Sequence, residues 1–448
     1  MMMSDLPMGW AWTELGNYIY VKNGYAFKSS DYIEANENTM PVIRISDIQD
    51  NEVSTISAVN IKIDDKFKDF FINNGDLLIA MSGATTGKIG TFKESEPAYQ
   101  NQRVGNIKLI NEKLGNLKFR YYLIQSLSKD IFEIAHGGAQ PNISGKAIEQ
   151  IEILLPPKAE QDHIATLLDK HLSQVAKIEQ KLNDILPILK QFRQSVLTQA
   201  ASGRLLAGLD FENWATVKLS EISQINPKKG KLDDDLEVSF SPMNLMPIKY
   251  GEPLKFEHKK WAEVKKGFTF FKENDILVAK ITPCFENGKS VVATNLINGI
   301  GTGSTEYHII RTDENTLPAW ILFHFKMESF LKEGAVNMTG SVGHKRVPKD
   351  FFENFDLKLP PLPEQQQIVS EVERLFALAD SIGTQVNEAL SRVGHLTQSI
   401  LHQAFMGNLS ANWREQNSEL ITGEHSATAP LAKIQDSKQA TKRKGTDK

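Results

Sequence analysis

The sequence predicts an α+β fold built by internal duplication, with two globular domains of mixed α/β structure, each followed by a long helix. Three observations predict this fold. The stretch LLPPKAEQ at 154–161 reappears as KLPPLPEQ at 358–365, which is 204 residues later. Each copy precedes about 40 residues with heptad-spaced apolar side chains. Each copy also follows some 150 residues that contain short strand-like segments bounded by Pro, Gly and Asn.

The repeat extends in both directions at the same offset. The pairs around the proline motif are Leu155/Leu359, Pro156/Pro360, Pro157/Pro361, Glu160/Glu364, Gln161/Gln365 and Ile164/Ile368. Downstream, QSVLTQAASGRL (194–205) aligns with QSILHQAFMGNL (398–409), and upstream Trp10 and Leu15 align with Trp214 and Leu219. A period of about 200 residues is far longer than that of solenoid repeats, so the pattern indicates duplication of a two-part module.

The two helical regions carry the spacing of a coiled-coil seam. Apolar residues alternate at four and three positions over five heptads, and matching seams favour packing of the two helices on each other, as a rod of roughly 60 Å. The predicted seam residues are Leu168, Val175, Ile178, Leu182, Ile185, Leu189 and Phe192 in the first helix and Val372, Leu375, Ile382, Val386, Val393, Leu396 and Ile400 in the second. Each Pro-Pro pair prevents an earlier helix start, and Gly203 and Gly407 are expected C-caps.

These features divide the chain into five segments. The globular domains are residues 1–155 and 207–358, and the helical regions are residues 156–206 and 359–410. Residues 411–448 form a polar and basic tail, whose last 17 residues, AKIQDSKQATKRKGTDK, contain six Lys or Arg against two Asp. A segment with so few apolar residues cannot build a core, so we expect the tail to be disordered.

Composition is that of an ordinary globular protein and does not by itself indicate a function. There are 51 basic and 55 acidic residues, which gives a formal net charge of −4, whereas nucleic-acid binding usually shows a basic excess. A basic stripe on an acidic protein remains compatible with these numbers. The single cysteine, Cys284, excludes an internal disulfide. No apolar run approaches a membrane span and the start, MMMSDLPMGWAW, lacks the pattern of a secretory signal, so we expect a cytoplasmic protein.

Motifs that would indicate catalysis fail on inspection. SGATTGKIG (82–90) has only three residues between Gly83 and Gly87-Lys88 and lacks the following Ser or Thr, so it predicts a glycine turn between two strands. GIGTGS (299–304) lacks the last glycine of a nucleotide-binding turn. No Cys-x-x-Cys or His-x-x-x-His pair and no Gly-x-Ser-x-Gly run is present. The triplet Glu257-His258-Lys259 has no recognisable upstream acidic partner for a nuclease centre.

Polar and basic loops in both globular domains are the remaining candidate sites. Arg, Lys, Asn and Gln can make two-pronged contacts to base edges, and Ser, Thr and Lys suit phosphate oxygens. The candidate DNA contacts are Lys22, Asn23, Tyr25, Ser82, Thr85, Lys88, Asn101, Gln102, Arg103, Gln140 and Asn142 in the first domain and Lys228, Lys229, Lys231, Lys280, Thr282, Ser304, Thr305, His344, Lys345 and Arg346 in the second. Each loop by itself also fits an ordinary solvated turn.

The combined pattern resembles the specificity subunit of type I restriction–modification enzymes over essentially the whole chain. The resemblance is carried by LPPKAEQDHIATLLD and LPPLPEQQQIVSEVERLF, by the two aligned helix ends and by the W-x4-L run that opens each half. It implies two target-recognition domains that each recognise half of a split sequence in double-stranded DNA. It also implies that the two helices pack antiparallel as a spacer between pseudo-twofold halves.

The resemblance further implies partners and a division of labour. The helices would dock two adenine-N6 methyltransferase subunits, and restriction/translocase subunits would join through these. S-adenosylmethionine, ATP and Mg²⁺ are then expected on the partner subunits, with no cofactor, metal or catalytic residue on this chain and no membrane association. Two other classes stay open. A self-sufficient DNA methyltransferase would need an Asn/Asp-Pro-Pro-aromatic run, but the only Pro-Pro pairs follow Leu155 and Leu359. A coiled-coil adaptor without DNA binding would leave the loop-rich domains idle.

Overall fold

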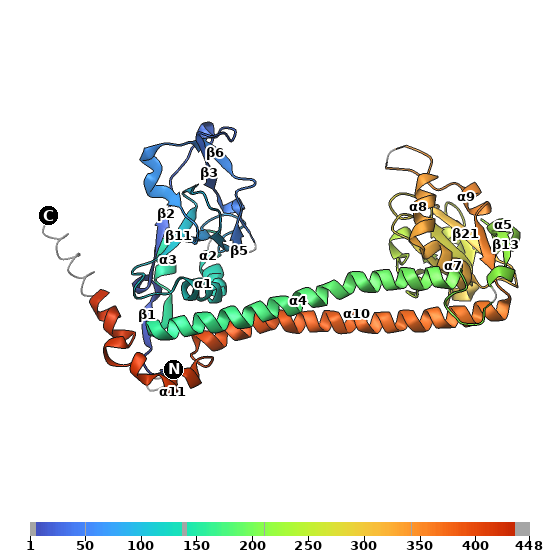
Figure 1. Ribbon diagram of the computed structural model, residues 1–448. Helices are drawn as coiled ribbons and strands as arrows, with labels where there is room; N and C mark the ends of the chain where they lie inside the picture. Colours follow the sequence, from blue (N-terminus) through green and yellow to red (C-terminus); the bar gives the residue numbers. More distant parts are fainter. Residues whose placement is uncertain (1–5, 50, 137–140, 210, 342, 435–448) are drawn as a thin grey trace. The chain divides into compact units, whose positions relative to one another are not determined.

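The computed structural model describes residues 6–49, 51–136, 141–209, 211–341 and 343–434. The chain separates into two compact units, here called unit 1 (Met1–Gln180 and Ser391–Lys448) and unit 2 (Lys181–Leu390). Each unit combines β-sheets with helices, which confirms the predicted mixed α+β class (Figure 1).

Unit 1 contains two larger sheets. One has the order β2-β11-β8-β9-β5-β4 and the other has the order β6-β3-β10-β7. Their strands are β2 (Ile19–Asn23), β3 (Thr39–Ile43), β4 (Ile48–Gln49), β5 (Asn51–Val53), β6 (Val59–Lys62), β7 (Phe71–Ile72), β8 (Leu77–Ala80), β9 (Ile89–Phe92), β10 (Ala98–Gln100) and β11 (Val104–Leu109). All four residues of β8 are buried, as expected for a central strand covered on both faces.

Short helices cover the first of these sheets in unit 1. They are α1 (Leu117–Ser126), α2 (Ser128–Ala135) and α3 (Gly145–Glu149). Side-chain caps start two of them: Asn116 accepts from the Phe119 amide at 2.9 Å and Ser144 accepts from the Ala147 amide at 3.1 Å. Apolar side chains of these helices share one core with β2, β8 and β11.

Unit 2 repeats this plan with the orders β14-β21-β18-β19 and β16-β15-β20-β17. Its strands are β14 (Ser223–Ile225), β15 (Glu237–Ser241), β16 (Glu257–Lys260), β17 (Thr269–Lys272), β18 (Ile276–Ala279), β19 (Ser290–Val292), β20 (Ile300–Gly303) and β21 (Tyr307–Thr312). Its short helices are α5 (Leu219–Ile222), α6 (Trp261–Val264), α7 (Pro318–Lys326), α8 (Glu328–Val336) and α9 (Lys349–Glu353).

Short 3₁₀ helices connect many of these elements. They are Leu15–Asn17, Ser29–Asp31, Ile45–Asp47, Asp65–Phe70, Phe211–Asn213, Met243–Leu245, Ile297–Gly299, Ser418–Leu420 and Gly423–His425.

The two units share strand order and pairing, apart from β4 and β5, which extend the first sheet of unit 1 alone. In both units the second sheet contains one parallel pair, β3 with β10 and β15 with β20. A buried aspartate precedes the central strand in each unit and pairs with a basic side chain on the neighbouring strand. Asp76 binds Lys108, whereas Asp275 forms two bonds of 2.7 Å with Arg311.

The repeated proline motif forms the junction between each globular part and its helix. A two-stranded sheet carries the first and last strands of each part, β1 (Ala11–Glu14) with β12 (Glu152–Leu155) and β13 (Ala215–Lys218) with β22 (Asp356–Leu359). The indole of Trp10 donates to Glu160 at 2.7 Å, and that of Trp214 donates to Glu364 at 2.8 Å. The motif glutamate therefore ties the start of each domain to the start of its helix.

The motif glutamine stabilises the same junction. Gln161 and Gln365 are buried, and each donates its amide to the carbonyl oxygen of the first proline of its pair, Pro156 or Pro360, at 2.9 Å. That carbonyl lies just before the helix, where Pro-Pro leaves few backbone donors. The duplication therefore preserves a hydrogen-bonded joint as well as a sequence.

The long helices α4 (Lys158–Ala201) and α10 (Leu362–Phe405) pack against each other. In unit 2 the Arg193 guanidinium pairs with Asp380 at 2.6 Å and lies over the Phe376 ring. α4 continues through Pro187. Gly203 and Gly407 follow the helix ends with φ of +66° and +78°, so the predicted glycine C-caps are confirmed.

Three of the predicted seam residues keep much of their surface in solvent. Ile178, Ile382 and Leu396 are 48%, 36% and 44% exposed. The buried members are Leu168, Val175, Val372, Val386 and Val393, and the half-buried ones are Leu182, Ile185, Leu189, Phe192, Leu375 and Ile400. A pair of helices buries one narrow strip, so side chains at the edge of that strip keep much of their surface in solvent.

The predicted disorder of residues 411–448 is wrong for residues 411–434; the remainder lies outside the described residues. Helix α11 (Ala411–Gln416) follows the end of α10, and Ile421, Ala427 and Leu431 are buried in unit 1. Arg414 pairs with the fully buried Glu160 at 2.8 Å, and the Trp413 ring stacks on His163. This segment has few apolar residues, but they bury against a surface that unit 1 already provides.

Candidate nucleic-acid interface

Three segments of unit 1 meet at the end of β8. The Met81 amide donates to the carbonyl of Arg103 at 2.9 Å, and the Met81 carbonyl accepts from the Ile143 amide at 2.9 Å. Ser82 and Asn142 form an isolated antiparallel bridge next to them. The β8–β9 turn, the residues before β11 and the residues before α3 are therefore fixed together by backbone hydrogen bonds.

The SGATTGK stretch forms the turn between β8 and β9, as predicted for a glycine turn between strands. Gly83 and Gly87 have φ of +80° and +86°, where a side chain would be strained. The Gly87 amide donates to the Ala80 carbonyl at 2.8 Å. The GIGTGS stretch lies on β20 of a sheet, and not at the start of a helix.

A hollow of about 880 Å³ opens where these three segments meet. It is lined by Ser82, Gly83, Ala84, Gln102, Arg103, Pro141 and Asn142. Four predicted DNA contacts, Ser82, Gln102, Arg103 and Asn142, thus gather in one place. Arg103 and Gln102 are exposed. Gln140 lies outside the described residues.

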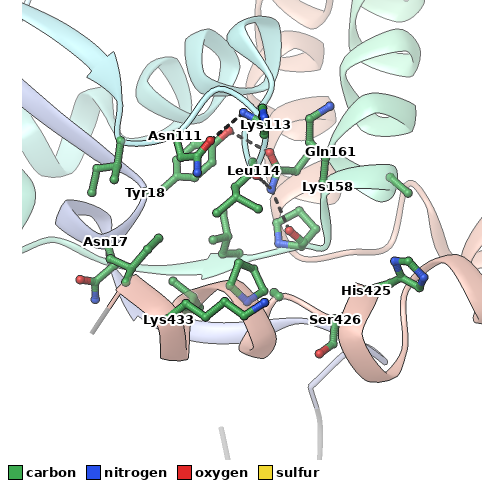
Figure 2. Close-up of a pocket in the computed structure, with 18 of the residues that line it drawn as sticks. Asn17, Tyr18, Asn111, Lys113, Leu114, Lys158, Gln161, His425, Ser426 and Lys433 are labelled. Atoms are coloured by element: carbon green, nitrogen blue, oxygen red, sulfur yellow. Dashed lines mark hydrogen bonds between the residues drawn. The ribbon is translucent and has the colours of Figure 1, made fainter. Parts of the chain in front are cut away.

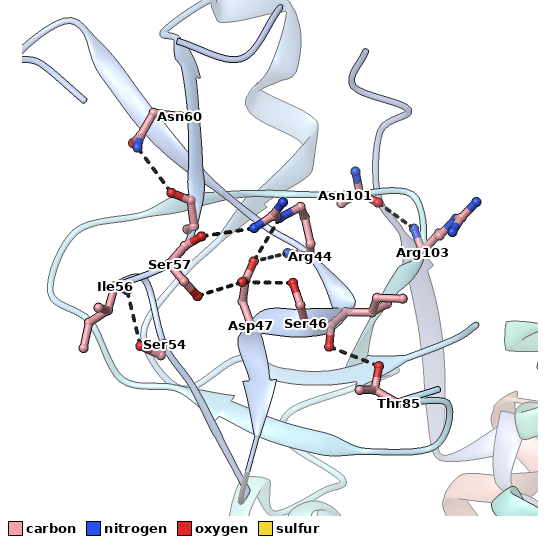
Figure 3. Close-up of polar contacts among 12 residues, drawn as sticks. Arg44, Ser46, Asp47, Ser54, Ile56, Ser57, Asn60, Thr85, Asn101 and Arg103 are labelled. Carbon is pink, nitrogen blue, oxygen red and sulfur yellow. Dashed lines mark hydrogen bonds and ion pairs between the residues drawn. The ribbon is translucent and has the colours of Figure 1, made fainter. Parts of the chain in front are cut away.

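Hydrogen bonds of neighbouring residues fix the loops that line this hollow. Asn101 is buried and accepts from the Arg103 amide at 3.2 Å, and Thr85 donates to the Ile45 carbonyl at 3.2 Å (Figure 3). Lys88 is exposed on the same turn. These contacts orient the turn, so the side chains of Asn101 and Thr85 are engaged in protein hydrogen bonds.

No residue of the loop after β3 was predicted from the sequence as a DNA contact. Asp47 is buried and accepts from the Arg44 amide at 2.8 Å and from the Ser57 hydroxyl at 3.3 Å, and Arg44 donates to the Ser57 carbonyl at 3.0 Å (Figure 3). Between these fixed points Ile56 is 97% exposed. Arg44 is a basic residue after a strand, but its sequence neighbourhood carries no glycine or amide cluster that would have marked it.

The remaining predicted contacts of unit 1 lie on β2 and just after it. Lys22 and Asn23 pair with Asn106 and Gly105 of β11. Tyr25 forms a bridge with Asn101, and its ring packs in a cluster with Phe27, Phe67 and Phe70, although the residue as a whole is 40% exposed. Tyr25 therefore has a structural role in addition to any contact with DNA.

Unit 2 builds the same three-segment meeting point from different residues. The Lys280 amide donates to the Glu306 carbonyl at 2.9 Å, and the Lys280 carbonyl accepts from the Val347 amide at 2.8 Å. Ile281 and Arg346 form the isolated bridge. By these bonds Lys280 is equivalent to Met81, Glu306 to Arg103 and Arg346 to Asn142.

An ion pair occupies this point in unit 2. Arg346 donates from Nε and Nη2 to the two carboxylate oxygens of Glu306 at 2.8 and 2.7 Å. The Arg346 guanidinium holds the pKa of Glu306 below its usual value. Burial lowers the pKa of the nearby Lys280, while Glu306 opposes that shift. Glu306 was missed in the sequence because carboxylates do not match the pattern of basic and amide side chains that suits DNA.

Other predicted residues of unit 2 surround this pair or lie apart from it. Thr282 donates to Glu286, Ser304 accepts from the Glu306 amide, and Thr305, His344 and Lys345 are exposed. The basic run Lys228, Lys229 and Lys231 follows β14, and Lys229 donates to the Lys265 carbonyl at 2.5 Å.

A second hollow in unit 1, of about 1250 Å³, lies beside the start of α4 (Figure 2). Residues of the segment 420–434 line it together with Tyr18, Leu114 and Gln161. The Tyr18 hydroxyl donates to Gln161 at 2.9 Å, so these polar groups already bind each other. In the described part of the chain, no three His, Cys, Asp or Glu side chains gather as a metal site would require.

Among the described helices, none combines the length and apolar character needed to cross a bilayer.

Comparison with known proteins agrees with this geometry. The sequence model of the family described as "Type I restriction modification DNA specificity domain" matches residues 7–186 and 211–392. The chain is 31% identical over 461 residues to the EcoBI type I restriction enzyme specificity subunit of Escherichia coli, covering 96% of this chain and 93% of that one. It is 40% identical over 226 residues to the EcoAI specificity subunit of Escherichia coli, covering 49% of this chain and 38% of that one.

A solved structure shares the fold. A chain described under "complex assembly and conformational transition of the type I R-M system" superposes with a TM-score of 0.68 at 17% identity, covering 90% of this chain and 99% of that one.

Proposed function

Because this chain belongs to the family of type I restriction–modification specificity subunits, we propose that it recognises a bipartite, asymmetric sequence in double-stranded DNA. Unit 1 recognises one half of the target and unit 2 recognises the other. One observation carries this proposal: the same backbone meeting point presents Arg103 and Asn142 in unit 1 but Glu306 and Arg346 in unit 2. A shared framework with different polar side chains suits two domains that recognise different sequences.

The chemistry of these side chains suits base edges. Arg can donate two hydrogen bonds to guanine, and Asn or Gln can pair with adenine. Their loops are fixed by backbone hydrogen bonds and by side chains such as Asn101, which lowers the entropy lost on binding. Exposed Lys88 and Lys345 suit phosphate contacts, which position the protein without sequence preference.

The proposed partners are two adenine-N6 methyltransferase subunits that dock on the helical regions, with restriction/translocase subunits joining through them. The repeated Trp–Glu and Gln–Pro junctions support this, because they give both helix starts the same local structure, and two similar regions on one chain suit two identical partners. The target adenine must leave the DNA stack to be methylated, so this chain positions the DNA and a partner supplies the reaction. S-adenosylmethionine, ATP and Mg²⁺ are accordingly assigned to the partners.

An exchange of one recognition domain tests the function. Residues 212–355 are replaced by the corresponding residues of the EcoBI subunit, and methylated adenines are mapped in cells that supply the methyltransferase partner. We expect one half of the methylated sequence to change while the other half stays the same. The reciprocal exchange in unit 1 is the matched control. A change of both halves in either chimera would contradict separate recognition.

A self-sufficient methyltransferase is tested by calorimetry on the purified chain. Both Pro-Pro pairs precede the long helices α4 and α10, where they end a strand and do not form a catalytic loop. We therefore expect no heat from titration with S-adenosylmethionine. A stoichiometric binding isotherm would show that this chain carries its own cofactor site.

A further inference from the structure

The guanidinium of Arg346 is fixed on one of its edges by Glu306. Besides the two bonds to that carboxylate, Nη1 donates to the His344 carbonyl at 3.1 Å. An arginine has five N–H groups, so one N–H on Nη1 and one on Nη2 remain. The Arg346 side chain is 45% exposed, and these two donors are available to an outside acceptor.

The backbone that carries Arg346 is also fixed. Arg346 exchanges two hydrogen bonds with Thr339, at 2.8 and 3.0 Å, and forms a bridge with Ile281. The next residue, Val347, is buried and is bound through its carbonyl by the His308 ring at 3.0 Å. Backbone and side chain are thus both oriented before any ligand binds, which is the condition for selective recognition.

We propose that Arg346, oriented by Glu306, is the specificity-determining residue that recognises a guanine in the half-site bound by unit 2. The two remaining N–H groups match the O6 and N7 acceptors that guanine presents in the major groove. Glu306 is a positioning residue, because it fixes the angle of the guanidinium. This inference rests on the proposed function and assigns one residue and one base type to it.

A phosphate is the alternative ligand for the same two donors, and the charges disfavour it. Phosphate contacts depend on positive charge; the pair of Arg346 and Glu306 is neutral, and the positive charge beside it lies on Lys280 and Lys345. The Glu306 side chain is 24% exposed, so its carboxylate would repel a phosphate that approached the pair. Guanine is uncharged, so its O6 and N7 acceptors are repelled less by that carboxylate than a phosphate would be.

The first experiment maps methylated sequences for single-residue variants of the full chain with its methyltransferase partner. The Arg346→Lys variant keeps the positive charge but loses the planar guanidinium, which can donate to two acceptors at once. We expect the guanine position to relax by roughly 5- to 150-fold in preference, with the other half-site unchanged. The Glu306→Gln variant should relax the same position to a smaller extent without weakening DNA binding overall, because it removes a negative charge. A merely structural role of Glu306 would not produce that combination.

The chain offers a matched control for the ion pair itself. On α10, Arg374 donates from Nε and Nη2 to Glu371 at 2.8 and 2.7 Å, with the same geometry as Arg346 and Glu306. Arg374→Lys should leave the methylated sequence unchanged, whatever its effect on the rate of methylation. A change of sequence in this variant would show that loss of any such pair alters specificity.

The second experiment uses oligonucleotides of the mapped target in which each guanine of that half-site is replaced by 7-deazaguanine. One replacement removes one of the two acceptors, so it should weaken binding of the wild-type complex by roughly 2- to 13-fold and should have no further effect on the Arg346→Ala complex. The proposal is overturned if that half-site contains no guanine on either strand. It is also overturned if Arg346→Lys keeps the full sequence preference, or if Arg346→Ala weakens all sequences equally, as loss of a phosphate contact would. Absence of any bipartite methylation by the wild-type complex would instead reject the proposed function.

Discussion

Unit 1 and unit 2 stabilise the junction between the globular part and its long helix by different contacts. The tryptophan–glutamate bond is common to both, but in unit 1 Glu160 also binds Ser410 at 2.6 Å and pairs with Arg414. In unit 2 the segment after α4 packs apolar side chains on Trp214 instead, and the rings of Phe211 and Trp214 pack edge to face with their centroids 5.2 Å apart. The two junctions share a backbone arrangement but need not contribute equally to stability. Removing one partner of a buried ion pair leaves an unpaired buried charge, whereas losing an apolar contact does not.

The largest difference should appear when the C-terminal segment is removed. Truncation after Ser410 deletes Arg414 and the buried Ile421 and Leu431, and it leaves Glu160 buried without its base. Burial of each large apolar side chain contributes about 1.5–3 kcal/mol, and breaking a buried pair costs about 3–5 kcal/mol, against a total stability of about 5–15 kcal/mol. We expect unit 1 to unfold while unit 2 keeps its amide protection in hydrogen exchange.

Truncation after Ile434 is the control for that experiment, because it keeps every described contact. If the chain truncated after Ser410 keeps native amide protection in unit 1, the C-terminal segment contributes little to the stability of that unit.

The junction glutamates offer a direct comparison at equivalent positions. Glu160→Gln should lower the free energy of unfolding by about 3–5 kcal/mol, because Arg414 stays buried and unpaired. Glu364→Gln should cost about 1.5–3 kcal/mol, because only the charged hydrogen bond from Trp214 is weakened. Urea unfolding of both variants measures the difference. Equal losses would mean that Arg414 adds nothing to the junction of unit 1.

Acid should affect unit 2 before unit 1, because the histidines that are buried in the described residues lie in unit 2. Burial lowers the pKa of His308 and of His324 from 6.5 to about 4. Both stay neutral in the folded unit, whereas the unfolded chain binds a proton as pH falls through 6.5. The stability of unit 2 is therefore complete above about pH 6.5 and declines toward pH 4, by about 2–3 kcal/mol for each histidine.

Hydrogen exchange of β18 and β21 between pH 7 and 4.5 measures this decline. His308→Gln keeps a donor for the Val347 carbonyl and cannot titrate, so its loss of protection should be smaller than that of the wild type. Identical pH profiles for the two proteins would assign the acid sensitivity to other groups.

The smallest effect is expected at the exposed edge of the helix pair, and it should be equal in the two repeats. Ile178→Ala and Ile382→Ala should each change the free energy of unfolding by within about 0.5 kcal/mol. Leu168→Ala, at a fully buried position of α4, should cost about 2–5 kcal/mol. Thermal unfolding of the three variants tests this. A large loss at Ile178 or Ile382 would place these residues in the seam after all.

The sequence by itself determined the duplication, the mixed fold class, the two long helices and their glycine ends. These features depend on short-range patterns: heptad spacing, paired prolines and glycines just after a helical stretch are visible in the sequence without a partner segment. The glycine turn between β8 and β9 was predictable for the same reason. The gathering of Ser82, Gln102, Arg103 and Asn142 was only partly predictable, because the residue types were evident but their proximity was not.

Tertiary structure alone decided the features that join distant segments. Glu306 and Arg346 are 40 residues apart in the sequence, and no local pattern pairs them. Residues 411–434 are too polar to form a core, yet they fold because unit 1 supplies apolar surface and the buried Glu160. Ile178 and Ile382 fit the heptad spacing but remain exposed, since spacing determines which face a side chain shares and only the packed neighbour determines whether that face is covered.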